Sequence, residues 1–244
     1  MTLARRAALQ PAFLIHHRDY TDSSRIVELL TRGHGRISLF ARGARRAKSP
    51  LRPLLQPFVP LLVSWSGGID GGQLVGAELA GEALPLPPQR LMSGFYLNEL
   101  VLRLTVRGEP VQELFDLYAY ALEDLRRGAG EQAALRNFER QLLEHIGYGL
   151  DVTRDAATGE PLEANRYYHF QPGLGLRAAG TPVEGETAFL GADLLDVSEG
   201  RLGSPQSLRV AKRLLRAALE HCLEGRGLRS RDVMLALRRL EAEE

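Results

Sequence analysis

The sequence contains a single cysteine, Cys222, among its 244 residues. One thiol can form neither an intramolecular disulfide nor a multi-cysteine zinc site, so both are excluded. No run of about 18 uncharged apolar residues occurs, and residues 1–10 are not followed by an apolar segment of signal-peptide length. We therefore expect a cytoplasmic globular protein.

Acidic residues are absent between Glu28 and Asp70, although the whole chain carries 31 basic and 30 acidic residues. The cations of this span are Arg32, Arg36, Arg42, Arg45, Arg46, Lys48 and Arg52. Like charges so close together repel one another, and an anionic polymer that releases counterions on binding explains why they are kept. A solvated basic loop is the alternative.

Short apolar runs separated by turn residues fill the first 80 residues. The β-patterned segments are Ala12–Arg18, Arg25–Thr31, Gly35–Arg42, Phe58–Trp65 and Gln73–Leu79. This number of closely spaced strands is typical of a small closed barrel of the OB kind, and an SH3-like barrel would share it. Residues 1–10 have no strand period and end at Pro11, so we expect a partly ordered leader.

Helical spacing replaces the strand pattern after the proline-rich stretch Ala83–Gln89. Apolar residues recur at this spacing in Arg90–Arg107, Pro110–Arg127 and Glu131–Tyr148, which predicts a three-helix bundle. Further helices are expected after the N-cap candidates Ser204 and Ser230.

Residues Asp151–Gly203 are rich in glycine, proline and threonine. They predict a small module with little core and a hairpin formed by Arg166–Gln171 and Gly175–Ala178. The expected fold class is therefore α+β. We expect a barrel domain over residues 1–84 and a helical domain over residues 85–244, with the module at 151–203.

Catalytic and metal-binding patterns do not stand out. His16 and His17 are adjacent, so on a strand they point to opposite faces. The glycine-rich Gly67–Gly76 lacks the Lys-Ser/Thr of a phosphate loop, and no HExxH motif occurs. The sequence predicts a non-catalytic protein with no cofactor.

Three other clusters are candidates for binding. Tyr167–Phe170 is aromatic, and it either stacks bases or packs the hairpin. Arg136 and Arg140 are four residues apart on one helix edge, beside the apolar Leu135 and Leu142. Such a cationic rim beside an apolar cleft suits a peptide with acidic residues and an aromatic carboxyl end. The basic residues within 209–216 form either a solvated face or a second phosphate contact.

Several short motifs are distributed along the chain, among them Gly43-Ala44-Arg45, Leu55-Gln56-Pro57-Phe58, Asn98-Glu99-Leu100, Leu135-Arg136 with Phe138-Glu139, and Gly147-Tyr148-Gly149. With them the chain resembles the bacterial RecO family of recombination mediators. The resemblance implies an OB barrel, a helical domain and a small module that binds zinc through four cysteines in some members. Residues 151–185 contain no cysteine, so we expect a zinc-free module.

The resemblance also implies an activity and partners. Family members act in the RecF pathway: they bind single- and double-stranded DNA, anneal complementary strands, and work with RecR. They help load the recombinase RecA on DNA coated with single-strand-binding protein. The implied DNA-binding residues are Arg36, Arg42, Arg45, Arg46, Lys48 and Arg52.

The acidic tail of single-strand-binding protein is implied to dock at Arg136, together with Arg140, Leu135 and Leu142. A neighbouring family arginine is replaced here by Asn137. Two alternatives stay open: an OB-type module that binds RNA or ribosomal partners as an assembly factor, and a nuclease.

Overall fold

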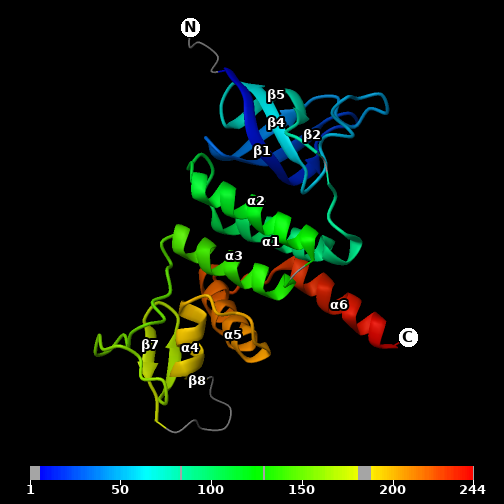
Figure 1. Ribbon diagram of the computed structural model, residues 1–244. Helices are drawn as coiled ribbons and strands as arrows, with labels where there is room; N and C mark the ends of the chain where they lie inside the picture. Colours follow the sequence, from blue (N-terminus) through cyan, green and yellow to red (C-terminus); the bar gives the residue numbers. More distant parts are fainter. Residues whose placement is uncertain (1–5, 83, 129, 181–187, 244) are drawn as a thin grey trace. The chain divides into compact units, whose positions relative to one another are not determined.

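The computed structural model describes residues 6–82, 84–128, 130–180 and 188–243 (Figure 1). Residues 1–5 of the expected leader, Ala83 of the proline-rich stretch and residues 181–187 of the expected module lie outside the described residues. The chain divides into two compact units: Met1–Gly128 with Leu228–Glu244, and Ala129–Gly227. Among the described helices, none has the length and apolar character that crossing a membrane requires.

A closed barrel forms the first part of the first unit. Its strands are β1 (Arg6–Asp19), β2 (Arg25–Thr31), β3 (Gly35–Ala41), β4 (Pro60–Ser66) and β5 (Asp70–Leu79). They pair in the order β1-β2-β3-β5-β4, with β3 parallel to β5 and β1 closing antiparallel onto β4. This is the OB order, so the predicted α+β fold with an OB-type barrel is confirmed. An SH3-like barrel is excluded.

Strand β1 begins at Arg6, so the predicted leader is wrong for Arg6–Gln10. The pairing of β1 with β4 shifts register between Ala7 and Gln10. Within this bulge the Leu9 N–H donates to Ser64 Oγ at 3.0 Å. The bulge interrupts the two-residue period that marks a strand in the sequence, which explains why the pattern is not visible there.

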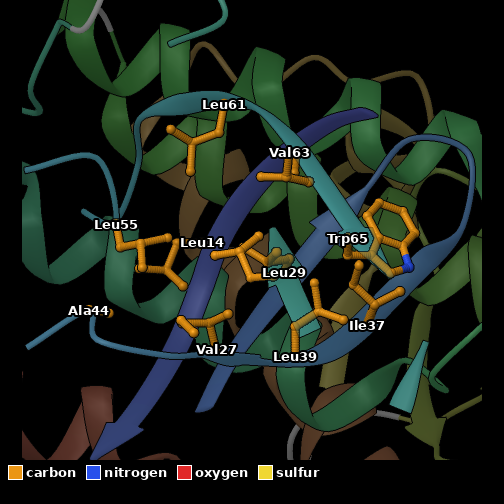
Figure 2. Close-up of a cluster of buried hydrophobic side chains, with 13 residues drawn as sticks. Leu14, Val27, Leu29, Ile37, Leu39, Ala44, Leu55, Leu61, Val63 and Trp65 are labelled. Carbon is orange, nitrogen blue, oxygen red and sulfur yellow. The ribbon is translucent and has the colours of Figure 1, made fainter. Parts of the chain in front are cut away.

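The barrel interior is filled by alternate residues of the strands and by two residues of the β3–β4 connection (Figure 2). These buried side chains are Ala12, Leu14, Val27, Leu29, Ile37, Leu39, Ala41, Ala44, Leu55, Leu61, Val63, Trp65 and Leu74. The opposite face of β1 is buried as well. Phe13 lies with its ring centroid 5.3 Å from Phe115 and 5.1 Å from Tyr118.

The helices of the first unit follow a 3-10 turn, η1 (Pro88–Arg90). They are α1 (Leu91–Leu104), α2 (Gln112–Arg127) and α6 (Arg229–Glu243). Helix α1 contacts both α2 and α6. The Glu99 carboxylate on α1 accepts hydrogen bonds from the Ser230 N–H at 2.8 Å and the Arg229 N–H at 3.0 Å. Helix α6 is thereby fixed at its first turn.

Phe58 and Arg126 connect the barrel to these helices. Arg126 donates to the Phe58 carbonyl at 2.7 Å and to the Leu84 carbonyl at 2.8 Å. The Phe58 ring packs 5.0 Å from Phe95, and a Cβ at Gly94 would lie 2.8 Å from it. A side chain at position 94 would therefore force the Phe58 ring or α1 to shift. The predicted boundary between a barrel domain and a helical domain after residue 84 stays a prediction.

The second unit combines three helices and a small sheet. The helices are α3 (Glu131–His145), α4 (Gly191–Ser198) and α5 (Pro205–Cys222). The sheet has the order β7-β6-β8, with β6 (Tyr167–Gln171), β7 (Gly175–Ala178) and β8 (Ala188–Leu190). Because α3 belongs to this unit, the predicted three-helix bundle is divided between the two units.

The hairpin of β6 and β7 matches its prediction, but the expectation of little core is wrong. Tyr168, Leu176, Phe189 and Leu194 are each at most 2% exposed. Strand β8 and helix α4, which complete this core, are too short for a periodic pattern to reveal. Helix α5 begins as predicted, with Ser204 and Ser207 forming a capping box.

Candidate nucleic-acid interface

The connection between β3 and β4 carries most of the predicted DNA-binding residues. Its second residue is Gly43, whose φ of +70° lies in the left-handed region that favours glycine. Successive turns follow: the Arg46 N–H donates to the Gly43 carbonyl at 3.1 Å, and the Ser49 N–H to the Arg46 carbonyl at 3.0 Å. We call residues 42–52 the basic loop.

Two apolar residues fix this connection to the barrel. Ala44 and Leu55 are 0% and 1% exposed and belong to the barrel core. Leu51 and Leu54 pack partly against the same core. Because the apolar residues face inward, the long cationic side chains between them extend into solvent. The basic loop is therefore a defined surface and not a free segment.

Four cations of the basic loop have no carboxylate partner among the residues that the structure describes: Arg42, Arg46, Lys48 and Arg52. All four are exposed. Arg45 differs, because its Nη2 lies 3.3 Å from Asp19 Oδ2 and its Nη1 donates to the Thr21 carbonyl at 2.7 Å. Arg45 fixes the loop to the β1–β2 connection while the other four carry unneutralised charge.

Arg36 does not join the basic loop. Its Nη1 lies 3.0 Å from Glu28 Oε2, and its Nη2 donates to the Thr105 carbonyl at 2.7 Å. The Arg36 side chain is only 12% exposed. An arginine whose donors are already used within the protein has little left to offer a phosphate. The structure thus sets Arg36 apart from the other predicted DNA-binding residues.

Glu28 lies at the centre of a group of ion-paired side chains formed by Glu28, Arg36, Arg107 and Asp70. We call this group the Glu28 corner. Arg107, which follows α1, also donates to the Glu28 carboxylate and lies 3.3 Å from Asp70. The hydrogen bond to Glu28, together with the charges of Glu28 and Asp70, outweighs the effect of burial and raises the pKa of Arg107. Arg32 is likewise paired, with Asp116 on α2 at 2.8 Å. Glu28, Arg107 and Asp116 were missed as determinants of the site, since no local spacing links them to the basic run.

The second predicted site lies on α3, which packs against α5. Leu135 and Leu142 are buried, at 5% and 0% exposure. The Arg136 side chain is 7% exposed and pairs with the buried Glu139. The Arg140 side chain is 38% exposed, with its Nη1 3.7 Å from Glu144. Of these predicted residues, Arg140 alone has a side chain that a peptide in solution can readily reach.

The remaining clusters have ordinary structural surroundings. Tyr168 is buried and accepts a hydrogen bond from the Glu163 N–H at 2.8 Å, whereas Tyr167 is 39% exposed. Phe170 lines a cavity of about 510 Å³. On α5, Arg213 lies over the Phe189 ring at 5.1 Å and Arg216 pairs with Glu220 at 2.8 Å. These contacts favour packing and a solvated face at these positions.

In the part of the chain that the structure describes, no group of three or more histidine, cysteine or carboxylate side chains is placed to hold a metal ion. Burial raises the pKa of the Cys222 thiol, which makes it less reactive.

Comparison with known protein families gives a clear relationship. Residues 6–81 match the family model "Recombination protein O N terminal", and residues 87–232 match "Recombination protein O C terminal". The first match covers the barrel, and the second begins at η1 and runs into α6.

Curated relatives agree with these matches. The chain is 43% identical over 228 residues to the DNA repair protein RecO of Methylococcus capsulatus, which is 93% of this chain and 93% of the relative. It is 42% identical over 236 residues to the DNA repair protein RecO of Nitrosococcus oceani, covering 96% of each. The identity to the DNA repair protein RecO of Glaesserella parasuis is 39%, over 92% of this chain and 93% of the relative. The chain belongs to the RecO family of DNA repair proteins.

Proposed function

We propose that this protein is a non-catalytic mediator of recombinational repair that acts in the RecF pathway and is located in the cytoplasm. In this role it binds single- and double-stranded DNA through the basic loop and anneals complementary strands. Acting with RecR, it helps load RecA onto DNA coated with single-strand-binding protein. The observation that carries the proposal is the set of exposed cations Arg42, Arg46, Lys48 and Arg52, which have no carboxylate partner in the described ranges and are held on an OB-type barrel.

Unpaired cations suit strand annealing for a physical reason. Two complementary strands repel one another through their phosphates, and each strand keeps a condensed layer of counterions. A surface of exposed cations replaces those counterions on both strands without reading base edges. Annealing of this kind needs positive charge in a fixed place and needs no general acid or base.

The test compares two triple variants with the same change in charge. The first replaces Arg42, Arg46 and Lys48 with alanine. The second replaces Arg32, Arg127 and Arg216, which pair with Asp116, Glu123 and Glu220. At low salt the first should weaken single-strand binding on the order of a hundredfold and slow annealing in parallel. The second should stay within about threefold of the parent, because paired surface cations contribute little.

Equal losses in the two variants would contradict the assignment of the basic loop. An RNA-binding assembly factor is the alternative function, and the same titration separates it. If a folded RNA of equal length displaces single-stranded DNA at matched salt and binds more tightly than DNA, the alternative holds instead.

The acidic tail of single-strand-binding protein is placed by this proposal on α3, near Arg140. The support is the partly exposed Arg140 side chain beside the Leu135-Arg136 and Phe138-Glu139 motif. Arg140→Ala should weaken binding of the tail peptide several-fold, as expected for loss of a charged contact at a rim. Arg166→Ala is the control, since Arg166 is an exposed and paired arginine of the same unit. Equal peptide affinity in the Arg140 variant and the parent would remove α3 from the site.

A further inference from the structure

Tyr20 presents an exposed aromatic ring at the turn between β1 and β2. The residue is 59% exposed. Its ring packs edge to face against Phe40, with centroids 5.1 Å apart and planes at 61°. Phe40 lies near the end of β3, directly before the chain enters the basic loop. An aromatic pair therefore lies at the point where the predicted phosphate contacts begin.

The backbone around Tyr20 is fixed to the basic loop. The Tyr20 N–H donates to the Ser24 carbonyl at 3.1 Å, which closes the turn. From the basic loop, the Arg45 N–H donates to the Ser23 carbonyl at 3.0 Å, and Arg45 Nη1 donates to the Thr21 carbonyl at 2.7 Å. Arg45 Nη2 adds the ion pair with Asp19 at 3.3 Å. These contacts hold the ring and the cations in one local structure.

An exposed tyrosine alone is ordinary, and this chain has another. Tyr120 on α2 is 66% exposed and has no aromatic partner among the described residues. Tyr20 differs because a second ring supports it and because the basic loop holds its turn in place. A supported ring beside exposed cations is a combination that binds single strands, in which cations follow the phosphates and rings stack on the bases.

We propose that Tyr20, supported by Phe40, stacks on an unpaired base of DNA held by the basic loop. The site would bind the exposed π-face of a nucleobase in a single strand and would have nothing to stack on within a duplex, whose bases are already stacked and paired. Tyr20 then determines preference for single strands, whereas the cations bind either form. This inference rests on the proposed DNA-binding function and adds a base contact to it.

The experiment measures affinity for two labelled oligonucleotides of on the order of 16 nucleotides, one with bases throughout and one with abasic positions at its centre. Both carry the same phosphates, so their ratio isolates the base contact. The full-length parent, Tyr20→Ala, Tyr20→Phe and Tyr120→Ala are compared over a range of salt. Trp65, the single tryptophan, is 3% exposed in the barrel core, and its fluorescence reports that each variant is folded.

The parent should prefer the oligonucleotide with bases by about tenfold, as expected for one stacked base. Tyr20→Ala should lose this preference and keep the salt dependence, while Tyr20→Phe and Tyr120→Ala should behave as the parent. Equal parent affinity for both oligonucleotides, or a preference that survives in Tyr20→Ala, overturns the stacking site alone. Absence of salt-dependent binding to either oligonucleotide overturns the proposed function itself.

Discussion

The basic loop and the Glu28 corner both contain arginines of the cation run between Glu28 and Asp70. The arginines of the corner are paired with carboxylates, whereas most cations of the loop are not. In the corner, Arg36 and Arg107 share the Glu28 carboxylate, whose side chain is 8% exposed. In the basic loop, four of the cations have no carboxylate partner within the described ranges. The difference shows that a cluster of charge in the sequence contains both structural and functional cations. Their surroundings, and not their spacing, separate the two kinds.

The largest effect on stability is expected from a substitution in the Glu28 corner. Glu28→Ala leaves two guanidinium groups close together without their shared carboxylate, so the free energy of unfolding should fall by about 3 kcal/mol. Urea denaturation followed by Trp65 fluorescence measures this directly. Glu78→Ala is the control, because Glu78 is an exposed residue of the same barrel. A loss as small as that of the control would mean that the corner does not stabilise the barrel.

The sequence predicted features that depend on local patterns of residues, but it did not predict features that depend on how the chain folds. The barrel strands were predictable because each one alternates or concentrates apolar residues over a short segment. The pairing of Arg36 was not, because Glu28 lies on a neighbouring strand and Arg107 comes from beyond α1. The buried position of Arg136 was missed for a related reason. Helical spacing placed it beside the apolar face and three residues from Glu139, but the burial of both side chains depends on how α3 packs in the folded chain.

A smaller effect is expected where Glu99 holds α6. Burial would raise the pKa of Glu99, but the hydrogen bonds from Ser230 and Arg229, together with the charge of Arg103, outweigh it and lower the pKa. Since the folded-state pKa is depressed, the stabilisation is present above the ordinary glutamate pKa of about 4.3 and is lost as the pH falls through the folded value.

Glu99→Gln should therefore lower the free energy of unfolding by about 1 kcal/mol at neutral pH, through loss of charge-assisted hydrogen bonds. The gap between parent and variant should shrink below about pH 4. Denaturation curves at several pH values, with Glu82→Gln as an exposed control, measure the gap. A gap that does not change with pH would show that the charge of Glu99 is not what holds α6.

The salt dependence of single-strand binding tests the division between free and paired cations most directly. For the parent, the triple variant of Arg42, Arg46 and Lys48, and Arg36→Gln, the logarithm of the binding constant is measured against the logarithm of the salt concentration. The triple variant should have a slope shallower by about 2, at about 0.7 per lost phosphate contact on a single strand, while Arg36→Gln should keep the parent slope. An unchanged slope in the triple variant, or an equal reduction in Arg36→Gln, would contradict the assignment of DNA binding to the basic loop.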